Sequence, residues 1–132
     1  MITVLGFRGA AAKPNVTPAT FLAVVSSAME KACGTHTVVQ SLSDTKIDSF
    51  DAHTAIMGCA NLGRYSEVAS YIAIKGSSDM YVINHAFRAE PFDKGSPPIS
   101  PAKAQELIGS LQPIKICELS EPPGQCRSRE PK

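Results

Sequence analysis

The spacing of apolar residues along the chain predicts strands that alternate with helices. A β-prone run over Thr3–Phe7 ends among glycines, as a strand followed by a tight turn does. Apolar residues then recur at helical spacing through residues 21–32. We expect this helix to start at Thr17-Pro18, because a hydroxyl side chain can cap the first turn and proline suits the first helical position. Gly34 supplies its end.

The middle of the chain is more ambiguous. β-branched residues favour a second strand over Thr35–Leu42, which ends at a polar turn. The apolar residues of Ser49–Leu62 share one helical face, but Gly58 weakens a helix, so a strand over Thr54–Met57 is the competing interpretation. The segment Tyr65–Ala73 then predicts a second amphipathic helix.

The last third repeats the earlier pattern. Met80–Phe87 predicts a buried third strand, Ser100-Pro101 a fourth helix start, and Ile114–Leu119 a final strand. The resulting order, β-α-β-α-α-β-α-β, is typical of a layered α/β fold with a small, mostly parallel sheet. The chain length of 132 residues fits one domain, which we expect over residues 1–120, with a flexible C-terminal tail at 121–132.

The composition of the chain limits the kinds of partner that we expect it to bind. The formal net charge is +1 and the 13 Lys and Arg residues are scattered, which argues against binding to nucleic acid or to a membrane surface. The start of the chain lacks a basic segment followed by a long apolar run, and no stretch has the roughly 20 apolar residues of a membrane span. We therefore expect a cytoplasmic protein.

The expected compartment determines the expected redox state of the cysteines. In the cytoplasm Cys33, Cys59, Cys117 and Cys126 would be reduced thiols, whereas removal of a leader would allow two disulfides. Cys33 and His36 have ligand-like spacing, with His53 and Cys59 as conceivable partners, but a structural zinc site normally shows two close pairs. We expect no metal and no other cofactor.

A ligand crevice in such a fold lies beyond the carboxyl ends of the strands. The most suggestive residues there are Gly6, Arg8 and Gly9, because glycines let a backbone approach a ligand and the Arg8 guanidinium matches a carboxylate or phosphate. The spacing of a phosphate-binding loop is absent. An ordinary turn after a strand is therefore the competing interpretation.

Two enzymatic arrangements deserve weight as alternatives. Cys59, His85 and Asp93 follow one another as in papain-like amidases, in which an imidazole activates a thiolate and a carboxylate orients it. Arg8 and Glu106 have a spacing that resembles ADP-ribosyltransferases, although the central Ser-x-Ser is missing. The simpler interpretations are a core cysteine, a histidine at a strand end and a solvated helical glutamate.

One family resemblance spans about half of the chain. Leu5–Ala11, the helix after it, Ser41–Lys46 and Ser66–Ala69 resemble the CobE family of small cobalamin-biosynthesis proteins, which are similar to the C-terminal domain of CbiG. The resemblance implies binding of a corrin-type intermediate, with Arg8 and Lys46 nearest its peripheral carboxylates. We thus expect a small-molecule-binding or accessory protein of undetermined oligomeric state. A hydrolase, a transferase and a structural or protein-interaction module are the alternatives.

Overall fold

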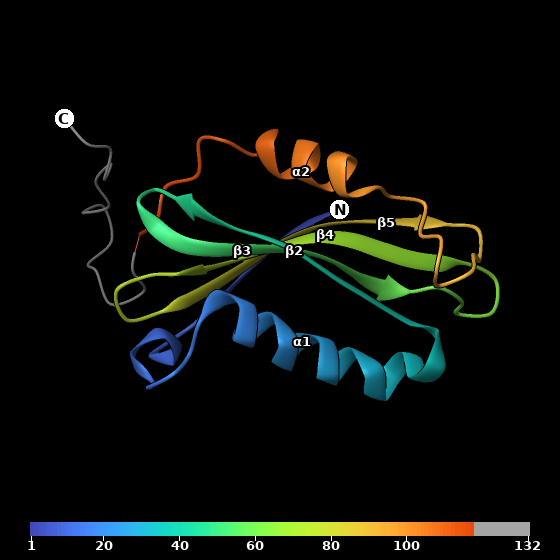
Figure 1. Cartoon of the computed structure of the whole chain (residues 1–132), viewed down its shortest axis with the longest axis horizontal. Helices are drawn as coiled ribbons and strands as arrows, with labels where there is room; N and C mark the ends of the chain where they lie inside the picture. The colour runs from blue at the N-terminus through green and yellow to red at the C-terminus, as the bar shows by residue number, and fades with distance from the viewer. Residues whose placement is uncertain (118–132) are drawn as a thin grey trace.

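A computed structural model describes residues 1–117 of the chain. Its elements are β1 (Ile2–Phe7), α1 (Pro18–Cys33), β2 (Thr37–Ile47), β3 (Phe50–Cys59), β4 (Ser66–Lys75), β5 (Met80–Ala89) and α2 (Pro101–Gly109), with short 3-10 turns at Ala10–Ala12 and Gly34–His36. The five strands form one sheet in the order β1-β5-β4-β3-β2. Helix α1 covers one face of this sheet and α2 covers the other (Figure 1).

The expected mostly parallel sheet is wrong, because every pair of neighbouring strands is antiparallel. Strands β2 to β5 follow one another as a meander, and β1 joins its far edge beside β5. Short turns connect the meander strands, whereas a parallel arrangement would need a crossover helix between each pair. Only α1 makes a long connection, from β1 at one edge of the sheet to β2 at the other.

Both predicted helix starts with a hydroxyl and a proline are confirmed. The Thr17 side chain accepts a hydrogen bond from the Thr20 amide at 3.1 Å, and the Thr20 hydroxyl oxygen accepts one from the Thr17 amide at 2.9 Å. At α2, the Ser100 hydroxyl accepts from the Lys103 amide at 3.1 Å. These bonds satisfy amides that have no partner within a first helical turn, so each helix begins where its sequence predicts.

The two helices expected between residues 49 and 73 are instead the central strands β3 and β4, and the competing interpretation of Thr54–Met57 as a strand is confirmed within β3. Both strands are covered by a helix on each side, so apolar side chains occupy both of their faces and the alternation typical of a strand is lost. Gly58 has a different role from the one expected, since a Cβ atom there would overlap the Glu67 carbonyl oxygen of β4. The expected strand at 114–119 is also wrong as far as residue 117, and the rest lies outside the described residues.

The sheet divides the core into two layers. Odd-numbered residues of β3 and β4 face α1, and even-numbered residues face α2. The α1 layer contains Leu22, Ala55, Met57, Ala73, Met80 and Val82. The α2 layer is built from Ile56, Val68, Ile72, Ile74, Ile99, Ala104 and Ile108.

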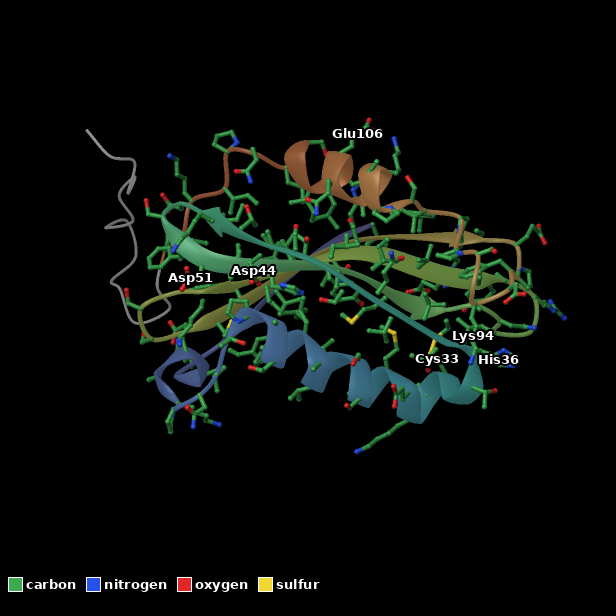
Figure 2. All side chains as sticks on the ribbon, viewed as in Figure 1. Cys33, His36, Asp44, Asp51, Lys94 and Glu106 are labelled. Atoms are coloured by element: carbon green, nitrogen blue, oxygen red, sulfur yellow. A yellow bond between two sulfur atoms is a disulfide. The ribbon has the colours of Figure 1, made fainter. Side chains whose placement is uncertain are left out.

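A disulfide joins Cys33 to Cys59, so the expectation of reduced thiols is wrong for both. The bond links the end of α1 to the end of β3 and holds the helix against the sheet (Figure 2). Cys117 is disulfide-bonded as well. Cys126 and the predicted tail at 121–132 lie outside the part of the chain that the structure describes.

Candidate functional site

A β-bulge in β2 brings together three side chains that can do chemistry. Ser41 pairs with Ala55 and Asp44 pairs with His53, so two residues of β2 stand opposite the single residue Thr54 of β3. In a regular strand, residues three apart point to opposite faces of the sheet. The extra residue of the bulge places Ser41 and Asp44 on the same face, the one that α1 covers, with His53 between them.

These side chains form a continuous chain of hydrogen bonds. The Oδ1 atom of Asp44 lies 2.7 Å from Nδ1 of His53, and Nε2 of the same ring lies 2.6 Å from the Ser41 Oγ. An ionised carboxylate can only accept, so Nδ1 carries the hydrogen of the neutral ring and Nε2 accepts from the Ser41 hydroxyl. The His53 residue is 8% exposed, whereas Ser41 and Asp44 are exposed.

The order of these contacts matches the requirements of nucleophilic acyl transfer. A serine hydroxyl is a weak nucleophile until an adjacent base removes its proton. His53 is placed to do this for Ser41, and Asp44 fixes the tautomer of the imidazole and would stabilise its protonated form. The arrangement is recognised by geometry and roles, since the same set occurs on unrelated folds in different chain orders.

Ser41 and His53 line a cavity of about 200 Å³ between α1 and the strands β2 and β3. Its remaining walls come from Ala19, Leu22, Ala23, Ser26, Val39, Ala55 and Met57. Asp44 does not line this cavity. It borders a separate, more polar hollow with Thr17, Pro18, Thr45, Asp51, Ala52 and Lys75. The Ser41 end of this hydrogen-bonded chain therefore faces an apolar space, and the Asp44 end faces a polar one.

The far face of the sheet supports the bulge. The side chain of Gln105, on α2, donates through Nε2 to the Ser43 Oγ and to the Thr54 Oγ1, both at 3.0 Å. The Ser43 amide also donates to the Thr54 Oγ1, at 3.3 Å. Thr54 is 1% exposed, whereas Ser43 and Gln105 are exposed, so the Thr54 hydroxyl is the buried end of this set of bonds. The irregular backbone that positions Ser41 and Asp44 is thus tied to α2.

Charged residues border the carboxylate end of the site. Lys46 forms an ion pair with Asp51 on the neighbouring strand, and its hydrogen bond and positive charge lower the pKa of the Asp51 carboxyl. Lys75, on the next strand, donates to the Val16 carbonyl at 2.8 Å. Asp44 and Asp51 lie at the same end of the sheet, near the start of α1 (Figure 2).

The expected ligand-binding residues do not meet at one site. Lys46, Asp51, Lys75, Met80 and Phe7 form one row across the whole sheet, and Arg8 follows Phe7 at the edge opposite Lys46. Four strand spacings separate these edges, roughly 19 Å. The Gly9 amide donates to the Asp79 carboxylate at 2.9 Å. Gly6 lies within β1, opposite Tyr81.

The predicted amidase residues are also dispersed. Cys59 is held in the disulfide and has no thiol to act as a nucleophile. Cys59 pairs with Glu67 while His85 pairs with Ser70, and because residues 67 and 70 of β4 point to opposite faces, the two side chains lie on opposite sides of the sheet. Asp93 occupies an exposed turn, where its carboxylate accepts from the Gly95 amide at 3.0 Å.

The two residues of the predicted transferase arrangement lie on different elements. Glu106 points outward from α2 (Figure 2), and its carboxylate lies 3.4 Å from the Lys103 ammonium. Arg8 instead follows β1 at the edge of the sheet. Among residues 1–117, no three His, Cys, Asp or Glu side chains are grouped so that they could hold a metal ion. Glu106 is a solvated helical residue, as its simpler interpretation has it.

Sequence reasoning missed the site that the structure does assemble. In the sequence, Ser41 and Asp44 belong to the segment that carries the family resemblance, Asp44 also belongs to the polar turn after the second predicted strand, and His53 is a conceivable metal ligand. Two residues three positions apart in a strand are expected on opposite faces, so nothing in their spacing predicts a shared site. The remaining signal was weak, a histidine nine residues after an aspartate in a segment with two interpretations.

No helix among the described residues is long and apolar enough to cross a membrane. Comparisons of the chain with protein-family models, with curated proteins and with solved structures find no match.

Proposed function

We propose that this protein is a serine-dependent hydrolase that transfers an acyl group from an ester to water. The observation that carries the proposal is the unbroken chain from Asp44 through His53 to Ser41, with contacts of 2.7 and 2.6 Å beside a cavity. Ser41 is the nucleophile, His53 the general base and acid, and Asp44 the group that orients the imidazole.

The reaction runs in two balanced halves. The Ser41 Oγ attacks the ester carbonyl carbon while its proton passes to Nε2 of His53, and His53 then gives that proton to the departing alkoxide. Water attacks the acylated Ser41 with His53 again taking a proton, the acid leaves, and Ser41 recovers its hydrogen. The intermediates carry an oxyanion that needs hydrogen-bond donors. Strand β2 is at the edge of the sheet, so one side of its backbone takes no part in strand pairing, and we propose N–H groups on that side as these donors.

The disulfide bears on the compartment in which this chemistry takes place. Disulfides persist in oxidising compartments and are rare in the cytoplasm. The pairing of Cys33 with Cys59 therefore favours an oxidising compartment over the cytoplasmic one expected from the sequence.

The binding of a corrin-type ligand, implied by the family resemblance, stays an untested proposal. The positions of Arg8 and Lys46 at opposite edges of the sheet give it no shared carboxylate site. A purely structural or interacting module is the rival to an enzyme. In that case the two hydrogen bonds of His53 would serve only to satisfy a buried imidazole.

A fluorophosphonate probe, which reacts with activated serines, tests the proposal on the intact protein. We expect mass spectrometry to find the label on Ser41, and hydrolysis of p-nitrophenyl butanoate to fall by roughly a thousandfold or more in Ser41→Ala. Asp44→Asn should lower the rate by roughly 10- to 100-fold, less than for a buried triad aspartate, because the Asp44 side chain is 89% exposed.

Ser27→Ala is the control for Ser41→Ala. Ser27 is an exposed residue of α1 that does not line the cavity, and its hydroxyl donates to the Ala23 carbonyl at 3.1 Å rather than to His53 or the bulge. Its loss should leave labelling and hydrolysis within a few-fold of the original protein. A Ser41 that stays unlabelled in the folded protein, with no hydrolysis above that of Ser41→Ala, would overturn the proposal and support the structural role.

A further inference from the structure

The cavity beside Ser41 also carries information on the substrate. Among its nine lining residues, only Ser26, Ser41 and His53 are polar, and none of the nine is an Asp, Glu, Lys or Arg. The other six are alanine, leucine, valine and methionine side chains. The cavity is thus lined largely by hydrocarbon, except at the two residues that we propose react with the substrate.

The hydroxyl hydrogen of Ser26 is already used. Its hydroxyl donates to the Ala23 carbonyl at 2.8 Å, within the same helix. An acyl chain with a charged end would lose its hydration in this space and find no oppositely charged side chain in the lining. The charged residues nearby, Asp51 and Lys75, line the separate hollow that Asp44 borders.

The volume limits how many carbon atoms of an acyl group the cavity can cover. A cavity of 150 Å³ is known to admit benzene, so about 200 Å³ accommodates a group of roughly four to seven carbon atoms. Small side chains create this space, chiefly Ala19 on α1 and Ala55 on β3. Larger residues at these positions would fill it.

We infer that the cavity is the acyl pocket of the site and takes short, uncharged aliphatic acyl groups. The inference rests on the proposed function for its chemistry, but the binding it describes can be measured without catalysis. Esters of butanoate to hexanoate fit both the apolar lining and the volume, whereas esters of dicarboxylates and of long-chain acids do not.

The test uses the Ser41→Ala protein, in which an ester can bind without being consumed. Binding of methyl butanoate is followed by NMR through the signals of Ala55 and Met57, and compared with monomethyl succinate and methyl decanoate. We expect methyl butanoate to bind at least tenfold more tightly than the charged ester, and the long ester not to shift these signals.

A second substitution, Ala19→Leu, should weaken methyl butanoate binding at least tenfold by filling the cavity. Ala28→Leu is the control, since Ala28 is an exposed residue of the same helix and does not line the cavity. Ala55→Leu would fill the cavity from β3. If this substitution at a buried position unfolds the protein, Ala19→Leu still decides the question from a partly exposed helix position.

The outcomes separate this inference from the proposed function. Binding of methyl butanoate that is lost in Ala19→Leu supports the acyl pocket even when Ser41 is never labelled, in which case only the hydrolase proposal fails. Labelling of Ser41 without any binding of methyl butanoate to the Ser41→Ala protein overturns the acyl pocket and leaves the hydrolase proposal standing. Equal binding of the charged and uncharged esters overturns it as well.

Discussion

The two faces of the sheet are built for different purposes. The face under α2 is close-packed, and Ile56, Ile72, Ile74 and Ile99 are each 0–1% exposed. The face under α1 contains the polar chain from Asp44 to Ser41, a cavity of about 200 Å³ and a disulfide at its far end. One face thus supplies most of the tightly packed core, while the other accepts imperfect packing where chemistry is proposed.

The two histidines of β3 and β5 show the same contrast. His53, on the α1 side, is hydrogen-bonded through both ring nitrogens. His85, on the α2 side, has a buried Nδ1 with no hydrogen-bond partner in the described structure. A neutral imidazole held in a defined tautomer is the form that a general base requires. The difference identifies His53, rather than His85, as the histidine suited to catalysis.

The largest effect on stability should come from cutting the covalent link of the α1 face. In the double variant Cys33→Ser with Cys59→Ser, the loss of a cross-link between residues 26 positions apart should reduce the free energy of unfolding by about 3.5 kcal/mol. The reason is that the unfolded chain regains the freedom that the loop closure removed. Urea denaturation measures the change.

The double variant avoids leaving one cysteine unpaired, and it leaves the disulfide of Cys117 intact, which a reducing agent would not. A change below about 1 kcal/mol would show that packing alone holds α1 on the sheet. The disulfide would then not be a feature that distinguishes the stability of the α1 face from that of the α2 face.

A smaller effect should follow from breaking the hydrogen bonds that join α2 to the β-bulge. In Gln105→Ala, the bulge loses two hydrogen bonds to Ser43 and Thr54, which should lower the free energy of unfolding by about 1–2 kcal/mol. Because the bulge sets the positions of Ser41 and Asp44, the rate of Ser41 labelling should also fall several-fold. Thermal unfolding and the fluorophosphonate reaction measure the two effects.

Glu106→Ala controls for the loss of a polar side chain from the same helix. Glu106 is exposed and its contact with Lys103 spans 3.4 Å, so both readouts should stay near those of the original protein. If Gln105→Ala lowers stability and leaves labelling unchanged, the α2 face acts only as a support. The bulge would then keep its shape without help from α2.

The sequence predicts β1, β5 and the two helices better than it predicts the central strands β3 and β4. Strand β1, both helices and strand β5 carry local signals, such as the hydroxyl-proline starts, that tertiary packing does not alter. Strand β4 carries none, and β3 carries only the weak signal at Thr54–Met57 that competes with a helix. Alanines at 52, 55, 69 and 73 suit a helix, and burial on both faces removes the alternation that identifies a strand.

The site was harder to predict than the fold for a related reason. A bulge is decided by the pairing of two strands. The polar turn at residues 43–45 predicts the end of β2, but the structure continues this strand to Ile47. Without the bulge and without β3 as a strand, Ser41, Asp44 and His53 have no reason to meet. Similarly, the pairing of Cys33 with Cys59 depends on α1 lying along the sheet.

The smallest effect concerns the charged residues at the carboxylate end of the α1 face. Lys46 lowers the pKa of Asp51, first through their hydrogen bond and then through its charge, so Lys46→Ala should raise that pKa toward its ordinary value. A carboxyl whose pKa is lower in the folded than in the unfolded protein stabilises the fold above its unfolded pKa. That contribution is lost as the pH falls through the folded pKa.

The stability difference between the original protein and Lys46→Ala should therefore be present near neutral pH and disappear in acid. It should be small, because both side chains are about two-thirds exposed, at 69% and 66%. An NMR titration of the Asp51 carboxyl measures the pKa directly. An unchanged pKa in Lys46→Ala would mean that another cation, with Lys75 the nearest by strand pairing, sets the charge at this end of the face. The polar hollow beside Asp44 would then depend on β4 rather than on the β2–β3 hairpin that carries the site.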